Sequence, residues 1–465
     1  MSFRARSLLL VLCGTIFLEG IDVAMLAVAV PAIRADLGLT TGTAAWVMSA
    51  YVLGYAGFTL LGGRAADLLG RRRMFLGWLT VFLLFSGLGG LTDQGWTLIL
   101  ARFVTGVAAA FMTPAALSVI TTSYEEGPQR NQALLIFAGT AAGGFSLGLV
   151  IGGLLTQLGW RWVFFAPVLL AAGVLAAAFR LIPKEPRPAR PQDGFDLPGA
   201  LTAAGAMLLL AYGVVRLEHG LDGWTLTAAV LAAGLGLAGV FVAVERRAAA
   251  PLVRLGILRE ASVLRADLGA LFFVGSFFGF QFVATLYLQE LRGWSPLETA
   301  LALVVMGCDA ILAPTLTPRL VARFGNARVI LGGFVLAVVS YALFLPVGPD
   351  WSYAAMFPTL LLTGLAFALA YGPLTIVGTE GIAGEEQGLA SGLLTTATQF
   401  GSAVGISAVT AVHGLSGGGL DGFRAALVVP LVMVGVGTVI TATGVRRSRG
   451  PGAAPAPEAP ADAVV

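Results

Sequence analysis

The sequence predicts an all-α polytopic membrane protein with fourteen transmembrane helices. Its 465 residues are 57% hydrophobic and 11% charged, whereas soluble domains carry about 25% charged residues. The apolar residues come in long blocks, and the mean hydropathy is +0.88. Most of the 28 Lys and Arg residues fall in alternate connections between these blocks, which is the asymmetry expected of membrane-spanning helices.

Each apolar block is long enough to cross a hydrocarbon core of about 30 Å, and a helix satisfies its backbone internally there. The first block is too long for the apolar region of a signal peptide and contains two acids, so we expect it to be retained as a span. The expected spans are 8–30, 43–63, 74–91, 97–120, 132–157, 162–180, 197–216, 224–244, 266–288, 297–316, 328–346, 353–376, 388–412 and 424–444.

An internal repeat is visible in this layout. Similar turns follow spans two and ten, GGRAADLLGRRRMFLGW at 62–78 and TPRLVARFGNARVILGG at 317–333, and spans five and thirteen are both rich in glycine. If spans seven and eight are an insertion, the remaining spans divide as six plus six, which is typical of secondary transporters. The expected regions are an N-terminal six-helix bundle (1–180), a linker with two additional helices (181–265), a C-terminal six-helix bundle (266–445) and a disordered cytoplasmic tail (446–465).

The basic connections also predict the orientation. If the N-terminus is cytoplasmic, the basic connections lie inside, and an even number of spans places both termini in the cytoplasm. One inner connection, ERRAAAPLVRLGILREASVLR at 245–265, alternates Arg with apolar residues. It is interpreted either as an amphipathic helix at the membrane surface or as a solvated linker with snorkelling arginines.

Several function classes lack their motifs. The two cysteines lie far apart in apolar runs, and the two histidines lie near span ends, so neither a disulfide framework nor a metal site is expected. The sequence has no P-loop, nucleophile elbow or HExxH motif. We therefore expect no enzyme activity, no ATP-driven pump, no cofactor and no metal.

Three acids inside the spans are the main candidates for a functional site. Glu19 and Asp22 are three residues apart, so they share one face of the first helix. Ionisable groups within a membrane usually face a bundle interior or a water-filled path. Two close carboxylates do not easily both ionise in a low dielectric, so one of them should be able to carry a proton near neutral pH.

Arg102 of span four is the expected counter-charge. Its depth in the membrane differs from that of Asp22 by only about 5 Å, and the pair is either part of the transport path or a static salt bridge between two helices. Asp309, midway along span ten, is the third acid. It is expected to hold a second proton or a cationic substrate, with a structural, hydrogen-bonded Asp near the Pro314 break as the alternative.

Aromatic and amide side chains of the second half are candidates for a substrate cavity. Span nine reads LFFVGSFFGFQFVATLY at 271–287 and supplies Phe278, Gln281 and Tyr287, while span thirteen supplies Gln399. These four residues are expected to line an apolar cavity with a few polar groups. The alternative is that the aromatic residues face lipid or pack against other helices.

On these motifs the chain resembles the major facilitator superfamily, and within it the bacterial fourteen-span drug:proton antiporters. DVAMLAVAVP at 22–31 is similar to the span-one pattern of that group, and ARFVTGVAAA at 101–110 to its span-four pattern. The loop after span two carries the signature G-x-x-x-D-x-x-G-R-R through Gly63, Asp67, Gly70, Arg71 and Arg72. The resemblance implies that this loop gates the conformational change; the alternative is that its charges only set the topology.

The antiporter motif of the same group, G-P-x-x-G-G, is incomplete in span five. The sequence reads GLVIGG, so Gly148, Gly152 and Gly153 are retained and Leu149 replaces the proline. The glycines are expected either to contribute to exchange or only to allow close helix packing.

The resemblance implies a proton-coupled exporter of amphipathic or cationic drugs, biocides or secondary metabolites, which works by alternating access. The expected setting is a bacterial plasma membrane, with a small molecule, protons and the lipid bilayer as partners, no nucleic acid, and a monomeric protein. Because the span-five proline is missing, a proton symporter or a facilitative uptake carrier is the alternative. A receptor or scaffold that binds a ligand without transport is the second alternative.

Overall fold

The computed structural model describes residues 3–39, 41–183, 196–219, 223–248, 251 and 253–447. Long helices joined by short turns make up most of this part of the chain. The helices of the first half are α1 (Phe3–Asp36), α2 (Thr41–Leu69), α3 (Arg71–Leu91), α4 (Gly95–Ser123), α5 (Pro128–Leu158), α6 (Trp162–Leu181), α7 (Leu197–Val215), the 3₁₀ turn η1 (Arg216–His219) and α8 (Trp224–Glu245).

The second half has shorter pieces between its long helices. Its elements are the 3₁₀ turn η2 (Leu255–Arg259), α9 (Ala261–Leu286), the π turn η3 (Tyr287–Leu291), α10 (Pro296–Leu303), the 3₁₀ turn η4 (Val304–Cys308), α11 (Asp309–Thr315), α12 (Thr317–Phe324), α13 (Asn326–Phe344), α14 (Tyr353–Thr379), the 3₁₀ turn η5 (Gly384–Glu386), α15 (Gln387–Leu415) and α16 (Gly419–Arg447).

The chain is a multi-pass membrane protein. Within the described residues, twelve helical segments are long and apolar enough to cross a membrane. The two other expected spans, 43–63 and 388–412, lie in the 29-residue helices α2 and α15, which are not among those twelve. The all-helical fold is therefore confirmed, whereas the number fourteen stays a prediction.

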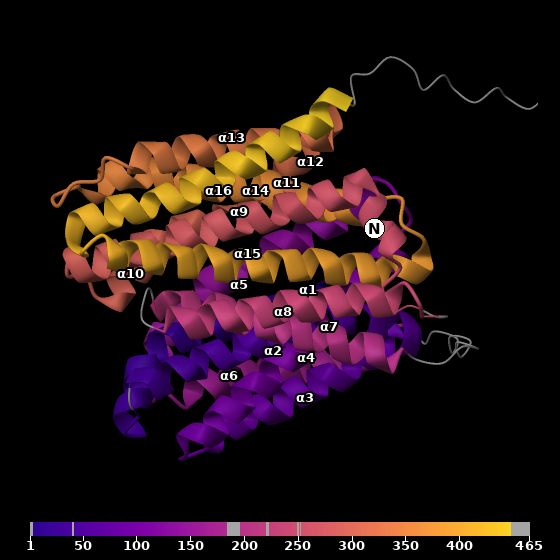
Figure 1. Cartoon of the computed structure of the whole chain (residues 1–465), viewed down its shortest axis with the longest axis horizontal. Coiled ribbons are helices and arrows are strands. Elements are labelled where there is room, and N and C mark those ends of the chain that lie inside the picture. The colour runs from indigo at the N-terminus through magenta and orange to yellow at the C-terminus, as the bar shows by residue number, and fades with distance from the viewer. Residues whose placement is uncertain are drawn as a thin grey trace, which may run out of the picture.

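The N-terminal and C-terminal helices occupy opposite sides of the molecule, with their axes running along its length (Figure 1). The described residues form two large buried apolar clusters. The first consists of residues between Leu8 and Ile182, together with Ile376, and the second consists of residues between Ala266 and Val434. The two sides meet where α2 contacts α15 and where α5 contacts α11. We call these two contacts the α2–α15 seam and the α5–α11 seam.

The expected span ten is a broken helix. Ser295 begins α10 with a capping box, in which its side chain bonds the Glu298 backbone and the Glu298 side chain bonds the Ser295 backbone. The helix then tightens to 3₁₀ geometry over Val304–Cys308 and resumes as α11 at Asp309. A 3₁₀ stretch in the middle of a helix often marks a hinge, and this one directly precedes a buried acid.

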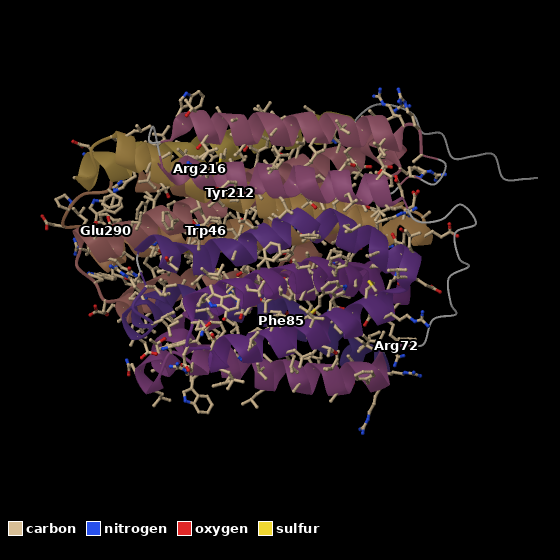
Figure 2. All side chains as sticks on the ribbon, turned by 60° about the horizontal axis from the view of Figure 1, so that its bottom comes forward. Trp46, Arg72, Phe85, Tyr212, Arg216 and Glu290 are labelled. Carbon is tan, nitrogen blue, oxygen red and sulfur yellow. The ribbon has the colours of Figure 1, made fainter. Side chains whose placement is uncertain are left out.

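We call the end of the molecule where α1 begins, α2 ends and α15 begins the basic end, because Arg64, Arg71 and Arg130 lie there. Figure 2 shows Arg72 at this end and Glu290 at the opposite end. The expected linker and tail fall largely outside the described residues, at 184–195 and 448–465.

The segment 245–265 differs from the expected amphipathic helix. The helix α8 ends at Glu245, the only helical piece described before α9 is the short turn η2, and Val253 and Ile257 are buried. Both belong to an apolar cluster that includes Leu389 of α15. Val253 and Ile257 therefore pack inward against protein, whereas Arg254 and Arg259 of the same segment are exposed.

Candidate functional site

Glu19 lies inside the first half of the molecule, with 5% of its surface exposed. Its two carboxylate oxygens accept hydrogen bonds from hydroxyl groups of two other helices. Tyr55 of α2 donates to Oε2 at 2.8 Å, and Thr113 of α4 donates to Oε1. Both donors are neutral, so they satisfy the oxygens without supplying a counter-charge. Burying a charge without a counter-charge is costly, so these surroundings suit a carboxyl group that takes up and releases a proton.

Asp22, one helical turn further along α1, has a different partner. Its Oδ2 lies 2.6 Å from a guanidinium nitrogen of Arg102 on α4, and each side chain is 2% exposed. The same guanidinium lies over the ring of Tyr51, 4.5 Å from the ring centre, where a cation–π contact adds to the pairing. The structure thus brings Asp22 and Arg102 together and gives the two acids of α1 unlike surroundings.

This ion pair leads to a prediction about stability. We expect Arg102→Met to destabilise the protein by about 3–5 kcal/mol, because it leaves a buried carboxylate without its partner. The double variant Asp22→Leu/Arg102→Met removes both charges and should recover most of that loss. Thermal unfolding in detergent compares the variants. Equal unfolding temperatures for the single and double variants would contradict the assignment of a tight ion pair.

Asp309 is buried in the second half of the chain. It is 1% exposed, and both of its carboxylate oxygens lack a hydrogen-bond partner among the described residues. It therefore shares no hydrogen bond with Glu19 or Asp22 there. An unsatisfied buried polar group requires an explanation, such as a catalytic or binding role or an ordered water or ion.

The signature residues, at the end of α2 and the start of α3, tie the two halves together at the basic end. Asp67 accepts hydrogen bonds from the backbone N–H groups of Gly388 and Leu389, both at 3.0 Å. Because these N–H groups lie in the first turn of α15, a negative charge is favourable there. Arg71 contacts Asp67 at 3.4 Å and donates to the carbonyl oxygen of Gly384.

Two other signature residues, Gly70 and Arg72, have different roles. Gly70 has a φ of 97°, in the left-handed region that favours glycine, and so allows the tight turn from α2 to α3. Arg72 donates to the carbonyl oxygen of Phe179 at 2.8 Å, within the first half of the chain. The structure therefore places Asp67 and Arg71, but not Arg72, in the contact with the second half.

A second link at the basic end was missed by sequence reasoning. Arg130 of α5 is 5% exposed; it donates to the Thr379 carbonyl oxygen at 2.8 Å and pairs with Glu126 at 3.0 Å. The backbone N–H of Gly381 in turn donates to Glu126 at 3.2 Å. The available signal is a basic residue at the start of an apolar span, a pattern that by itself indicates only the orientation of the helix.

Comparison with known proteins identifies the family. The sequence profile of the Major Facilitator Superfamily matches residues 12–406. This chain belongs to the major facilitator superfamily. Its relatives include the puromycin resistance protein pur8 of Streptomyces alboniger, 33% identical over 88% of this chain and 80% of the relative. They also include the cephamycin export protein CmcT of Amycolatopsis lactamdurans, 34% identical over 88% and 85%, and the lincomycin resistance protein of Streptomyces lincolnensis, 34% identical over 91% and 88%.

Solved structures confirm the major facilitator fold. The human organic anion transporter MFSD10 matches 95% of this chain and 100% of its own, with a TM-score of 0.70 and 16% identity. The proton:xylose symporter XylE matches 95% and 96%, with a TM-score of 0.66 and 16% identity. The family and both neighbours point to a transporter rather than an enzyme.

In this major facilitator protein two of the three span-five glycines lie against α1. A Cβ at Gly148 would lie 2.8 Å from the Cα of Ile21, and one at Gly152 would lie 2.6 Å from the Cα of Met25. Gly153 instead faces Leu297 of α10, 3.7 Å from such a Cβ. Gly148 and Gly152 therefore let α5 approach the helix that carries Glu19 and Asp22.

The structure separates Tyr287 from the three other expected cavity residues, Phe278, Gln281 and Gln399. The ring of Phe278 meets that of Phe145 on α5 edge to face, with centres 5.8 Å apart, so it lies at the contact between the two halves. Gln281 is 9% exposed and its amide oxygen has no described partner, while Gln399 is partly buried.

Tyr287 does not belong with the cavity. It is 0% exposed, packs against Phe344 and Phe423, and donates to the Gly348 carbonyl oxygen at 2.7 Å. This placement corrects the expectation for Tyr287, because a fully enclosed side chain in the core of the second half lines no cavity.

Proposed function

We propose that this chain is a proton-coupled exporter of amphipathic or cationic small molecules, such as drugs, biocides or secondary metabolites. The proposal places a monomeric protein in a bacterial plasma membrane, with fourteen spans and both termini cytoplasmic. Three relatives at 33–34% identity carry the names of antibiotic resistance or export proteins, which supports this class of cargo. The observation that carries the proton coupling is the contrast between Glu19, bonded by hydroxyl groups, and Asp22, paired with Arg102.

In the proposed mechanism, Glu19 carries the proton and Asp22 stays paired with Arg102. Protonation of Glu19 removes one charge from the centre of the first bundle and so favours one facing state over the other. Release of the proton on the other side of the membrane returns the protein to the first state. Asp309, whose carboxylate is unpartnered in the second bundle, provides the site for the cationic part of a cargo or for a second proton.

The alternating motion is proposed to occur between an N-terminal bundle (1–180) and a C-terminal bundle (266–445), joined by the linker and helices of 181–265. Two separate buried apolar clusters support this division. At the basic end, the hydrogen bonds of Asp67, Arg71 and Arg130 cross between the bundles. This structure is therefore interpreted as the state closed at the cytoplasmic side, and these contacts must break when the protein opens inward.

The test is transport by purified protein in proteoliposomes with an imposed pH gradient. We expect puromycin, a cephamycin, lincomycin or a lipophilic cation to move against the direction of proton flow, and the movement to stop when a protonophore collapses the gradient. Protein-free liposomes give the background. Cargo movement that ignores the protonophore would contradict proton coupling, and binding without movement would favour a receptor.

The uptake alternative rests on one residue. Leu149 stands where the antiporter motif of the resembling group has proline, and a symporter would not need that motif. In the same vesicles a proton symporter moves cargo in the same direction as protons. The direction of cargo movement relative to the gradient therefore distinguishes the two functions.

A further inference from the structure

The helices α7 and α8 cover one of the two seams between the bundles. A Cβ at Gly57 of α2 would lie 2.7 Å from Cγ of Leu208 on α7, so Leu208 fills the space that this glycine leaves. Ala211 of α7 is 1% exposed and shares an apolar cluster with α2 residues. Near the opposite end, the ring of Tyr212 stacks on Trp46 of α2 with centres 5.9 Å apart (Figure 2).

Helix α7 also reaches α15, and α8 packs against α7. Phe400 of α15 packs against the cluster that holds Ala211. Towards the basic end, Ala203 of α7 and Phe241 of α8 share a cluster with Leu389 and Ala390 of α15. Figure 1 shows α7 and α8 lying over the border between α15 and α2. The α2–α15 seam is thus screened from the surrounding bilayer along its length.

The α5–α11 seam is bordered by exposed side chains. Leu147 of α5 is 47% exposed, and on the other side Val304 and Ile311 are 40% and 69% exposed. Inside this border the two bundles meet through small residues. A Cβ at Gly143 would lie 3.1 Å from the Cβ of Ala310, and one at Gly139 would lie 3.3 Å from the Cβ of Ala313. Little side-chain bulk therefore separates the lipid face from the interior.

Asp309 lies directly behind these small residues. It is four residues before Ala313, so the two side chains share a helix face, and its carbonyl oxygen lies 3.3 Å from the Cβ position of Gly139. The carboxylate is buried and both oxygens are unpartnered in the described structure. The hinge-like turn η4 immediately precedes it. An acid without a described partner, one layer behind a lipid-exposed surface, can give up its proton and pair with an amphipathic cation that arrives from the membrane.

We propose that cargo enters from the bilayer through the α5–α11 seam to Asp309, and that α7 and α8 close the α2–α15 seam to it. The proposal rests on the proposed function, because it names the route by which that cargo reaches the site. It also gives a role to the two helices inserted between the bundles: they restrict entry from the bilayer to the α5–α11 seam.

Photo-crosslinking tests the route without depending on transport. A triphenylphosphonium cation that carries a benzophenone is added to proteoliposomes of the full chain, and adducts are mapped by mass spectrometry. We expect adducts along α5, α10 and α11 to exceed those on α2 and α15 by about tenfold, and Asp309→Asn to reduce them. A neutral benzophenone of the same chain length is the control. Equal labelling of both seams, equal labelling by the neutral probe, or no adduct at the α5–α11 seam would overturn the proposal.

A matched pair of variants tests the route in transport. Gly143→Leu fills the α5–α11 seam, whereas Gly173→Leu makes the same change on α6, where an added Cβ meets nothing within 4 Å. We expect Gly143→Leu to raise KM about tenfold and to suppress seam labelling, and Gly173→Leu to behave like the wild type. Unchanged KM and labelling in folded Gly143→Leu would overturn the route. Seam labelling in a wild-type protein that transports nothing would instead reject the proposed function and leave the binding route standing.

Discussion

Replacing Glu19 with Gln is expected to abolish transport driven by a pH gradient. The variant keeps the shape of the side chain: its amide oxygen can accept from one of the two hydroxyl groups, Tyr55 or Thr113, and its NH2 group can donate to the other. It cannot exchange a proton. A carrier whose proton site is fixed in the neutral form can still exchange cargo for cargo, because that exchange requires no net proton movement. We therefore expect gradient-driven efflux at the level of protein-free liposomes, together with preserved counterflow of labelled cargo.

Two variants serve as controls for this result. Tyr55→Phe removes one neutral donor and should shift the pH dependence of efflux while coupling survives. Asp309→Asn makes the corresponding change on the acid of the second bundle. Gradient-driven efflux that persists in Glu19→Gln but is lost in Asp309→Asn would move the proton site from the first bundle to the second.

Replacing Gly63 with Val is expected to abolish turnover by keeping the basic end from closing. A Cβ at Gly63 would lie 2.8 Å from the Cα of Gly392 and would also meet the carbonyl oxygen of Gly388. These obstacles are backbone atoms of α15, so no flexible side chain can move aside, and overpacking of this kind costs about 1–3 kcal/mol. The same approach of α2 to α15 is needed for Asp67 to reach the N-terminus of α15.

Accessibility measures the closure directly. Ser391 is 0% exposed at this contact, so Ser391→Cys, in a background without Cys13 and Cys308, should react with a water-soluble maleimide much faster in the Gly63→Val protein than in the protein that keeps Gly63. Gly77→Val on α3 is the matched control, because an added Cβ there meets nothing within 4 Å. A protected cysteine and normal transport in Gly63→Val would show that the tight contact is not a gate.

The sequence predicted contacts well where the membrane limits the position of individual residues. The hydrocarbon core fixes the depth of each residue along its helix, so the approach of Asp22 and Arg102 followed from counting residues from the span ends. The G-x-x-x-D-x-x-G-R-R pattern located the basic-end contact, although it did not distinguish Arg71, which reaches the second half, from Arg72, which bonds to Phe179.

Other features depend on how helices rotate and pack, which the hydropathy pattern leaves open. Tyr55 and Thr113 carry no sequence signal for their contact with Glu19, because hydroxyl residues are common in apolar spans. Tyr287 was placed in the cavity because it continues an aromatic run, but its helix turns it into the core. The cover formed by α7 and α8 depends on contacts with α2 and α15 that are distant in sequence.

Proton release on cargo binding is the measurement that tests the central claim most directly. Purified protein in weakly buffered detergent solution is mixed with a lipophilic cation, and a pH-indicator dye records the protons released. If Glu19 exchanges its proton for cargo, the wild type and Asp22→Asn release protons at a pH near neutral, whereas Glu19→Gln binds cargo and releases none. Equal release by the wild type and Glu19→Gln would contradict the assignment of Glu19 as the proton carrier.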